Sequence, residues 1–417
     1  MWATQLTLNN FRGFERLTLD LDRPVTVLVG VNGAGKSTVL RALGAQQGFI
    51  LSVYNRRHEL PAVTLDERDR KLGTTQSEVL TRMRHGSYRF GFRVWWEDPR
   101  DGWQGMFHAS ESAALFAQPG WPFLFLAGVR RHVDSANIRA QTPPSPDFPE
   151  ALEEAIAAAR AAEDAGAVSP SADYARFFEW FKEREDAENE RRVASRDLNL
   201  QDPYLRAVRE AVAALMPGFE GLRVQRTPRP CMVVKKDGAE LRLDQLSDGE
   251  RNLIALAGDL ARRMVLGAHA STDPREIECV ILIDEIEQHL HPAWQRAVIP
   301  SLRRAFPCAQ FVVTTHSPQV VSSVPASAVW VLDGTGAYPM AGATEGRDTN
   351  ALLREVFGVP ERPQAQLDAL RAVRVRIDAG ELDAARAELD ALALLLSEAD
   401  DDVVALRMRM HVAEAAE

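Results

Sequence analysis

The sequence contains little cysteine, no long apolar run and no excess of positive charge, and each shortage excludes a class of protein. Its three cysteines, Cys231, Cys279 and Cys308, have neither disulfide nor metal-site spacing, which argues for a reducing compartment. No apolar stretch approaches the roughly 20 residues of a membrane span, so the sequence predicts no membrane helix. Residues 1 to 29 are expected to form β-strands rather than a targeting signal, and we therefore expect a cytoplasmic protein. The formal net charge of −10 disfavours a broadly basic surface for nucleic acid.

The sequence does contain a glycine-rich segment with the spacing of a phosphate-binding loop, Gly30 to Ser37 (GVNGAGKS). The apolar run 25–29 before it predicts a strand and residues 37–43 after it predict a helix, which argues against a chance glycine-rich turn. Backbone N–H groups of such a loop and the following helix N-terminus attract nucleotide phosphates. We expect Lys36 to contact the β- and γ-phosphates and the Ser37 hydroxyl to bind Mg²⁺. The nucleotide-binding residues expected here are Asn32, Gly33, Ala34, Gly35, Lys36, Ser37 and Thr38.

A second segment combines a buried strand with two carboxylates. The apolar run 280–283 predicts a strand of a parallel sheet, buried on both faces, and Asp284 and Glu285 follow it. Ligands gather at the carboxyl ends of such strands, beside the phosphate-binding loop. We expect Asp284 to hold Mg²⁺ and Glu285 to orient the attacking water as general base. The alternative is an ordinary acidic pair at the end of a strand.

A third segment, residues 246–250 (LSDGE), precedes an amphipathic helix predicted over residues 251–265. Ser247 and Gly249 then lie at a helix N-terminus, which is a second site for an anion, and we expect Ser247, Gly249 and Glu250 to contribute to nucleotide binding. Because the chain already has one phosphate-binding loop, this site is most useful if it faces the nucleotide of another copy. Ser247 and Glu250 also have the spacing of a capping box, which helices use merely to begin. Both interpretations can hold together.

A histidine follows the next β-rich run along the chain. Residues 311–314 predict another strand, and His316 stands just after its end. From that position His316 would hydrogen-bond both the γ-phosphate and the general base. A lone histidine is more often structural, and its place after the strand next to Asp284 and Glu285 favours the functional interpretation.

Together these segments resemble the ABC-type ATPases, in the soluble branch that includes RecF, the heads of Rad50 and SMC proteins, and the OLD family. The opening segment from Leu8 to Phe14 is similar to the first strand of that branch, where the arginine, here Arg12, often approaches the nucleotide. The resemblance implies an α/β fold in which a parallel P-loop sheet joins an antiparallel β lobe, a helical insertion and a C-terminal helical hairpin. It also implies ATP and Mg²⁺ as cofactors, with closure by dimerisation.

A narrower resemblance covers nearly the whole chain. The chain resembles the predicted ATPases of Septu and retron-type anti-phage systems in residues 282–292, 294–295 and 314–320, and also in 177–181, 347–350 and 356–363. This resemblance implies a separately encoded effector, commonly an HNH-type nuclease. The sequence departs from the pattern at the Q-loop, where residues 122–131 stand and no glutamine is found, so this ligand of Mg²⁺ stays unassigned.

Composition divides the chain into four parts. We expect the first half of the ATPase core over 1–133, a helical insertion over 134–218, the second half over 219–345 and a helical tail over 346–417. Within the second half, residues 224–243 predict a hairpin that turns at Asp237 and Gly238. The tail is expected to form a helical hairpin, somewhat like half of a tetratricopeptide array. It is too short for the Toprim nuclease domain of the OLD family, so we expect no intrinsic nuclease activity.

The main hypothesis is therefore an ATPase that forms a homodimer, or a higher homo-oligomer, around two ATP·Mg²⁺ and controls a separate effector. The alternative is a RecF- or Rad50-like DNA repair or recombination ATPase that binds DNA itself, and a transporter subunit with a membrane partner is a third hypothesis. The basic residues available for DNA contact are Arg56, Arg57, Arg68, Arg70, Lys71, Arg82, Arg84, Arg89, Arg93, Arg223, Arg226, Arg229, Lys235 and Lys236. Solvated helix and hairpin faces are the favoured explanation of these residues, since acidic residues are interspersed among the first of them.

Overall fold

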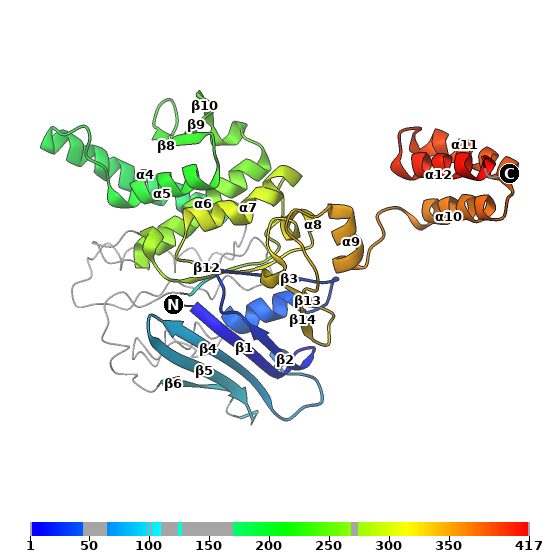
Figure 1. The fold of residues 1–417 in the computed structure, drawn as a ribbon. Helices are drawn as coiled ribbons and strands as arrows, with labels where there is room; N and C mark the ends of the chain where they lie inside the picture. Colours follow the sequence, from blue (N-terminus) through cyan, green and yellow to red (C-terminus); the bar gives the residue numbers. More distant parts are fainter. Residues whose placement is uncertain are drawn as a thin grey trace. The chain divides into compact units, whose positions relative to one another are not determined.

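The computed structural model describes residues 2–44, 65–97, 99–100, 102–109, 124–126, 170–267 and 274–415. These residues fall into two compact units, Met1–Arg347 and Asp348–Glu417. Each unit has its own arrangement of elements and is described by itself (Figure 1).

The first unit is built around a sheet of six strands in the order β14-β13-β3-β12-β11-β7. Neighbouring strands are parallel except that β14 runs antiparallel to β13. The strands are β3 (Val25–Val29), β7 (Leu124–Leu126), β11 (Val280–Ile283), β12 (Gln310–Thr314), β13 (Val329–Leu332) and β14 (Ala337–Pro339). Every residue of β11 and β12 is buried, which is why β11 and the centre of β12, Phe311 to Val313, are apolar rather than alternating. The strands predicted at 25–29 and 280–283 are confirmed.

A five-stranded antiparallel sheet packs beside this parallel sheet, in the order β2-β1-β4-β5-β6. Its strands are β1 (Trp2–Phe11), β2 (Phe14–Asp20), β4 (Ser77–His85), β5 (Tyr88–Trp96) and β6 (Trp103–Ala109). The helix over residues 36–44 contributes Val39, Leu40 and Leu43 to one hydrophobic core with both sheets. That shared core places the start of this helix at the seam between the two sheets. The expected fold class, a parallel P-loop sheet joined to an antiparallel lobe, is therefore present.

Helices lie on the other side of the parallel sheet (Figure 1). They are α4 (Pro170–Ser195), α5 (Pro203–Leu215), α6 (Asp248–Gly267) and α7 (Pro292–Ala305), with the short α8 (Pro318–Val321) after β12. Side-chain caps begin several of them: Asp202 accepts hydrogen bonds from the backbone N–H groups of Tyr204 and Leu205, and Ser317 caps α8. In both helices proline occupies the first turn, where no N–H partner is needed.

A small antiparallel sheet, in the order β10-β9-β8, connects the insertion to α6. Its strands are β8 (Phe219–Gln225), β9 (Cys231–Lys236) and β10 (Ala239–Arg242). The turn between β9 and β10 has positive φ at both Asp237 (50°) and Gly238 (83°), as a two-residue hairpin of this kind requires. The predicted turn is confirmed, although Val224 belongs to the separate strand β8 and not to this hairpin.

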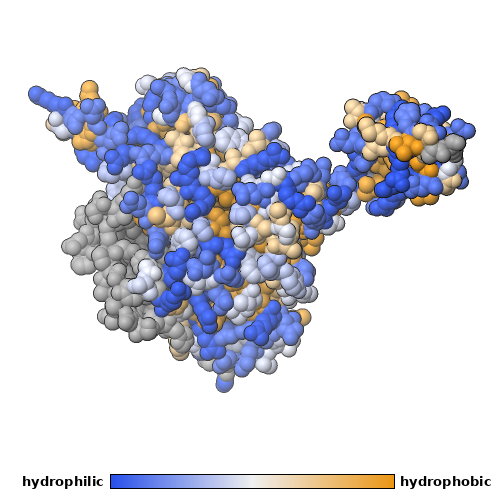
Figure 2. Space-filling model, in the orientation of Figure 1, coloured by the Kyte–Doolittle hydropathy of each residue, from blue (hydrophilic) through white to orange (hydrophobic). Residues whose placement is uncertain are grey.

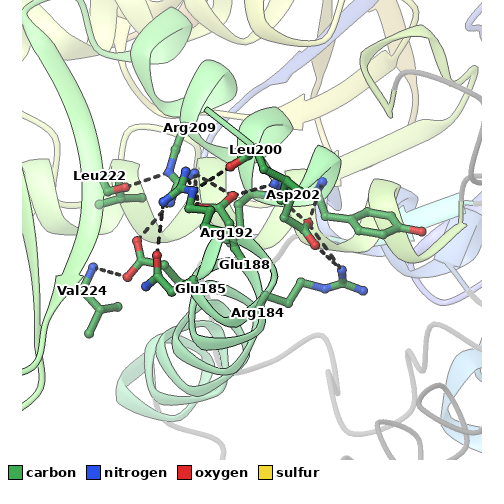
Figure 3. Close-up of polar contacts among 12 residues, drawn as sticks. Arg184, Glu185, Glu188, Arg192, Leu200, Asp202, Arg209, Leu222 and Val224 are labelled. Carbon is green, nitrogen blue, oxygen red and sulfur yellow. Dashed lines mark hydrogen bonds and ion pairs between the residues drawn. The ribbon is translucent and has the colours of Figure 1, made fainter. Parts of the chain in front are cut away.

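A buried ionic network holds α4 against α5 and β8 (Figure 3). Glu188 is fully buried and accepts a hydrogen bond from the backbone N–H of Asp202 at 2.5 Å. Its carboxylate also pairs with Arg192 at 2.9 Å and Arg209 at 3.4 Å. Glu185, one turn earlier, pairs with Arg209 at 3.0 Å and accepts from the backbone N–H of Val224 in β8 at 3.0 Å. The two elements that follow α4 in the chain, α5 and β8, are therefore both bonded to α4 through Glu185 and Glu188.

The same helix packs closely on α6. The Phe177 ring of α4 lies against Gly258 of α6, where an added Cβ would come within 2.3 Å of the ring. Phe177 is 1% exposed, and the ring takes the place that a side chain at position 258 would occupy. Residue 258 therefore has to be glycine for α4 and α6 to lie this close.

Over its described residues, 348–415, the second unit contains four helices: α9 (Thr349–Phe357), α10 (Gln364–Asp378), α11 (Leu382–Leu396) and α12 (Asp401–Glu414). The expected helical hairpin is present as α10 and α11, and a third helix packs on it to form one hydrophobic core. That helix, α12, begins in a run of acidic residues at 400–402, and Asp400 caps it by accepting hydrogen bonds from the N–H groups of Asp402 and Val403. The acidic residues near 400 thus begin a helix.

The surface is mostly hydrophilic on the face that Figure 2 shows, with hydrophobic residues visible on the second unit. Within the described ranges, no helix is both long and apolar enough to span a membrane. The most exposed apolar side chains of the second unit are Val375, Leu394, Leu395, Met408 and Val412.

Candidate active site

The glycine-rich loop follows β3 at the seam between the two sheets, and two of its glycines are required by their surroundings. Gly30 has φ of +147°, and a Cβ there would lie 2.2 Å from the backbone oxygen of Leu332. Gly35 has φ of +93°, and a Cβ there would lie 2.3 Å from the Phe14 ring. A side chain at either position would force the backbone apart, so only glycine allows the loop to lie here. The helix begins directly after it, at residues 36–44.

Lys36 is folded onto the loop that precedes it. Its side-chain amine donates hydrogen bonds to the backbone oxygens of Gly30 at 2.9 Å and Val31 at 3.0 Å. The residue is 6% exposed, and burial lowers the pKa of its amine despite the charges of Asp284 and Glu285 nearby. A buried ammonium group inside a loop of backbone N–H groups forms a site suited to an anion.

Ser37 and Asp284 meet although 247 residues separate them in the chain. The Ser37 hydroxyl donates a hydrogen bond to Asp284 Oδ2 at 2.9 Å, and Ser37 itself is exposed. The other oxygen, Asp284 Oδ1, accepts a hydrogen bond from the hydroxyl of Thr314 on the neighbouring strand. A hydroxyl and a carboxylate at one point are the oxygen ligands that Mg²⁺ prefers in nucleotide sites. The residues present therefore fit this ion.

Glu285 follows Asp284 in a backbone conformation that non-glycine residues seldom adopt. Its φ is +48°, and its backbone N–H donates a hydrogen bond to Thr314 Oγ1 at 2.7 Å. Such strained residues cluster at functional sites, where the surrounding structure holds them in place. The side chain is half-buried. Since Thr314 bonds to both Asp284 and Glu285, one hydroxyl positions the pair.

Glu287 is a site residue that the motif analysis did not single out. Its carboxylate accepts hydrogen bonds from the hydroxyl of Thr315 at 2.7 Å and from the backbone N–H of His316 at 2.6 Å. His316 is half-buried at the end of β12 and is brought to the same edge of the sheet as Glu285. The sequence feature that could have identified Glu287 as a site residue is its position, two residues after Glu285 and therefore close to the end of β11.

Ser247 and Glu250 form the capping box predicted for the start of α6. The Ser247 backbone N–H and hydroxyl donate to Glu250 Oε2 at 3.1 and 2.9 Å, and Lys236 donates to Glu250 Oε1 at 2.7 Å. Burial alone would raise the pKa of Glu250, but these hydrogen bonds outweigh it and lower the pKa. Among the hydrogen bonds of the described residues, none joins Ser247 or Glu250 to the glycine-rich loop of their own chain.

Gly249 lies against the loop that carries the acidic residues. A Cβ at position 249 would come within 2.7 Å of the backbone oxygen of His289. The glycine thus lets the first turn of α6 approach the segment that follows β11. Residue 249 is half-buried, whereas Ser247 and Asp248 beside it are exposed.

Arg12 is tied to a buried carboxylate. Its guanidinium pairs with Asp69 at 2.7 Å, and Arg41 of the helix 36–44 donates to both oxygens of Asp69 at 2.7 and 2.9 Å. Burial would raise the pKa of Asp69, but the hydrogen bonds and charges of Arg41 and Arg12 outweigh it, and the pKa is lowered. Arg12 therefore belongs to an ionic cluster behind the loop. The other predicted loop residues divide by exposure: Asn32 and Gly33 are exposed, Thr38 is half-buried and Ala34 is buried.

The segment expected at the Q-loop is described only in part. Residues 124–126 form β7, which pairs in parallel with β11 at the edge of the sheet. Residues 127–131 lie outside the described residues, and the missing ligand stays unassigned.

Many of the basic residues considered for DNA contact are paired with acids. Arg84 pairs with Asp22 at 2.8 Å, and Arg226 pairs with Asp186 at 2.6 Å and with Glu185. Further pairs are Arg70 with Glu67, Arg93 with Glu78, Arg223 with Glu240 and Lys236 with Glu250. Arg56 and Arg57 lie outside the described residues. The pairing offsets the positive charge that DNA contact needs.

Two family models and several known proteins are similar to this chain in sequence. A family model described as "AAA domain, putative AbiEii toxin, Type IV TA system" matches residues 25–322, and an AAA ATPase domain model matches residues 1–45. The retron Ec83 probable ATPase of Escherichia coli is 26% identical over 87% of this chain and 77% of its own length. The retron Vc95 probable ATPase of Vibrio cholerae serotype O1 biovar El Tor is 35% identical over 31% of this chain and 25% of its own length.

Two further matches are shorter or more distant. The Septu protein PtuA of Bacillus mycoides (strain KBAB4) is 43% identical over 18% of this chain and 10% of its own length. The SMC head domain from Thermotoga maritima covers 82% of this chain and 100% of its own, with 15% identity and a TM-score of 0.47. The sequence relatives confirm the predicted resemblance to retron and Septu ATPases.

Proposed function

The chain belongs to the AAA-domain family whose model matches residues 25–322, and we propose that it is an ATP-driven switch whose hydrolytic site is completed by a second copy. It is an AAA-type ATPase related to the retron and Septu ATPases. The observation that carries the proposal is the meeting of Ser37 and Asp284 at 2.9 Å beside the buried amine of Lys36.

Binding of the triphosphate is assigned to the glycine-rich loop. Lys36 would exchange its two hydrogen bonds to loop oxygens for the β- and γ-phosphates, and the backbone N–H groups from Asn32 to Thr38 would receive the remaining charge. Ser37 and Asp284 would hold Mg²⁺, which when bound neutralises phosphate charge. Arg12 is retained as a weaker nucleotide contact, because Asp69 holds its guanidinium.

Hydrolysis is assigned to Glu285 and His316. The Glu285 carboxylate would accept a proton from the attacking water, while His316 would hydrogen-bond the γ-phosphate and hold the base in place. Both residues follow adjacent parallel strands, β11 and β12, whose carboxyl ends meet at one edge. The strained backbone of Glu285, held by Thr314, supports a precise position for this carboxylate.

Closure by a second copy is assigned to the start of α6. Ser247 and Asp248 are exposed at a helix N-terminus, which suits an incoming phosphate. No hydrogen bond within the described residues ties Ser247 to the loop of its own chain. We therefore propose that the start of α6 in one copy contacts the nucleotide bound by another copy. The assembly would then be a homodimer or a higher homo-oligomer.

The output of the switch is assigned to a separate effector in anti-phage defence. The names of the sequence relatives place those proteins in retron and Septu systems. We propose an HNH-type nuclease as the effector and no nuclease activity in this chain itself. Copurification of the untagged neighbours from the native operon identifies the effector directly.

The Glu285→Gln variant tests the hydrolytic role. Glutamine keeps the shape but cannot accept the proton, so turnover should fall by roughly 100-fold or more while ATP still binds. Size-exclusion chromatography with ATP should then show an accumulated dimer. Glu276→Gln, an exposed carboxylate shortly before β11, serves as the control and should behave as wild type. Unchanged turnover in Glu285→Gln would remove this residue from the base role.

Mixing two inactive variants tests the shared site. Lys36→Ala removes the loop amine and Ser247→Arg blocks the start of α6, so each protein alone should be inactive. In a mixed dimer one of the two sites combines a wild-type loop with a wild-type α6, and part of the activity should return. A mixture that stays inactive, together with a chain that remains monomeric with a non-hydrolysable nucleotide, would contradict the proposal.

A further inference from the structure

The Glu287 carboxylate links the two loops that carry the proposed catalytic residues. It belongs to the loop after β11, two residues beyond Glu285, and both its oxygens accept hydrogen bonds from the loop after β12. Oε2 accepts from the Thr315 hydroxyl at 2.7 Å and Oε1 accepts from the His316 backbone N–H at 2.6 Å. A carboxylate that receives two short hydrogen bonds from adjacent residues holds that backbone in one orientation.

The loop held by Glu287 is itself anchored to the sheet. Thr315 is fully buried, and its backbone N–H donates to the backbone oxygen of Leu28 in β3 at 3.1 Å. The Thr315 hydroxyl also accepts a hydrogen bond from the backbone N–H of Ser317 at 3.0 Å. Because that hydroxyl has accepted one bond, its own proton is directed at Glu287. The contact is therefore defined in both direction and distance.

The same pair of segments also holds Glu285, the proposed general base. Thr314, next to Thr315, accepts from the backbone N–H of Glu285 and donates to Asp284. Side-chain hydrogen bonds thus join the segment 284–287 to the segment 314–316, and the bond that reaches His316 is made by Glu287. Removing the Glu287 carboxylate would keep the hydrogen bonds of Asp284 and Glu285 to Thr314 but take away those from the Thr315 hydroxyl and the His316 backbone N–H.

We propose that Glu287 is a positioning residue that sets the distance between His316 and Glu285. It acts through the backbone of His316 and does not touch the substrate. This inference rests on the proposed function, since it assumes that Glu285 and His316 take part in hydrolysis. Glu287 contributes ordering of the two residues before the reaction begins, which is the kind of effect that alters turnover more than binding.

The Glu287→Gln variant separates positioning from binding. Glutamine has one acceptor oxygen and one NH₂ group, so it cannot accept from both Thr315 and His316, and one of the two donors loses its partner. We expect kcat to fall by roughly 10- to 100-fold, the loss that a misplacement of about 1 Å produces, with KM for ATP changed by less than about threefold. In a His316→Ala background the same substitution should change kcat by less than about threefold. Glu276→Gln is the carboxylate control.

Two variants of Thr315 test the same contact from the other side, and a folding check accompanies them. Thr315→Ser keeps the hydroxyl that donates to Glu287 and should retain turnover within about threefold of wild type, whereas Thr315→Val should lose as much as Glu287→Gln. Thermal unfolding of each variant, followed by circular dichroism, confirms that the compared proteins are folded.

The possible results separate the inference from the function on which it rests. Absence of ATP hydrolysis by the wild-type chain, alone and with its operon partners, would overturn the proposed function. Wild-type hydrolysis with unchanged kcat in both Glu287→Gln and Thr315→Val would overturn only the positioning role. A raised KM with unchanged kcat would place Glu287 on the substrate, and full additivity with His316→Ala would show that it does not act through His316.

Discussion

Replacing Glu188 with glutamine tests whether the buried network holds α4 on the core. Glu188 is 0% exposed. It accepts a hydrogen bond from the backbone N–H of Asp202 and forms ion pairs with Arg192 and Arg209. Glutamine occupies nearly the same volume but carries no charge, and its NH₂ group turns a donor toward an arginine. The variant therefore leaves two arginines without one of their carboxylate partners.

The size of the effect follows from the contacts that remain. Removing one partner of a buried ion pair costs about 3–5 kcal/mol. Arg192 and Arg209 are 25% and 22% exposed, and Arg209 keeps Glu185 at 3.0 Å, so water and the second carboxylate offset part of the loss. We expect a loss of about 2–3 kcal/mol for the opening of this region, below the full cost of breaking a buried pair.

Hydrogen exchange measures this opening directly. The backbone N–H of Asp202, which donates to Glu188, should exchange about 30- to 140-fold faster, since 1.4 kcal/mol corresponds to a factor of ten. Glu190→Gln changes an exposed carboxylate two residues further along the same helix and should leave the rate unaltered. Equal exchange rates in Glu188→Gln and Glu190→Gln would refute the argument that the network holds α4.

Two other predictions concern close packing and pH. Gly258→Ala should lower the free energy of unfolding by about 1–3 kcal/mol, because its methyl group would displace the Phe177 ring; a gain in stability on thermal unfolding would contradict this contact. Asp69→Asn should reduce stability near neutral pH, because the Asp69 pKa is lowered by Arg41 and Arg12 in the folded state. A carboxylate with a lowered folded pKa stabilises the fold above its unfolded value of about 3.9 and loses this effect as pH falls through the folded value. The difference between wild type and Asp69→Asn in urea unfolding should therefore be constant from pH 5 to 7 and shrink below about pH 4; a difference that grows on acidification would reverse the sign of the argument.

The elements around the proposed site could be predicted from the sequence because their signals are local. A run of β-branched residues before Gly30 and a helix-forming run after Ser37 lie within a few residues of the loop. The capping box at Ser247 and Glu250 spans only four residues, and the turn at Asp237 and Gly238 only two. In each case short-range backbone and side-chain chemistry decides the conformation, so the pattern is legible without knowledge of the fold.

The contacts that join distant segments could not be placed in this way. Glu287 touches Thr315, and Phe177 fills the space beside Gly258, but neither pairing leaves a periodic or motif-like signal. The same holds for Asp69, whose two arginines come from the turn after β1 and from the helix after the loop. The sequence analysis predicted a helical hairpin in the tail, and the packing of α12, capped by Asp400, on that hairpin was not predicted.

The sequence by itself determined that the chain carries a glycine-rich loop between a strand and a helix, an acidic pair after a buried strand and a capped helix start. Only the tertiary structure decided that Ser37 lies 2.9 Å from Asp284, that Arg12 is held by Asp69 and that Glu287 reaches the backbone of His316. The physical reason is that parallel strands bring together residues hundreds of positions apart at one edge of a sheet. Their meeting depends on the register of β3, β11 and β12, which long-range packing selects.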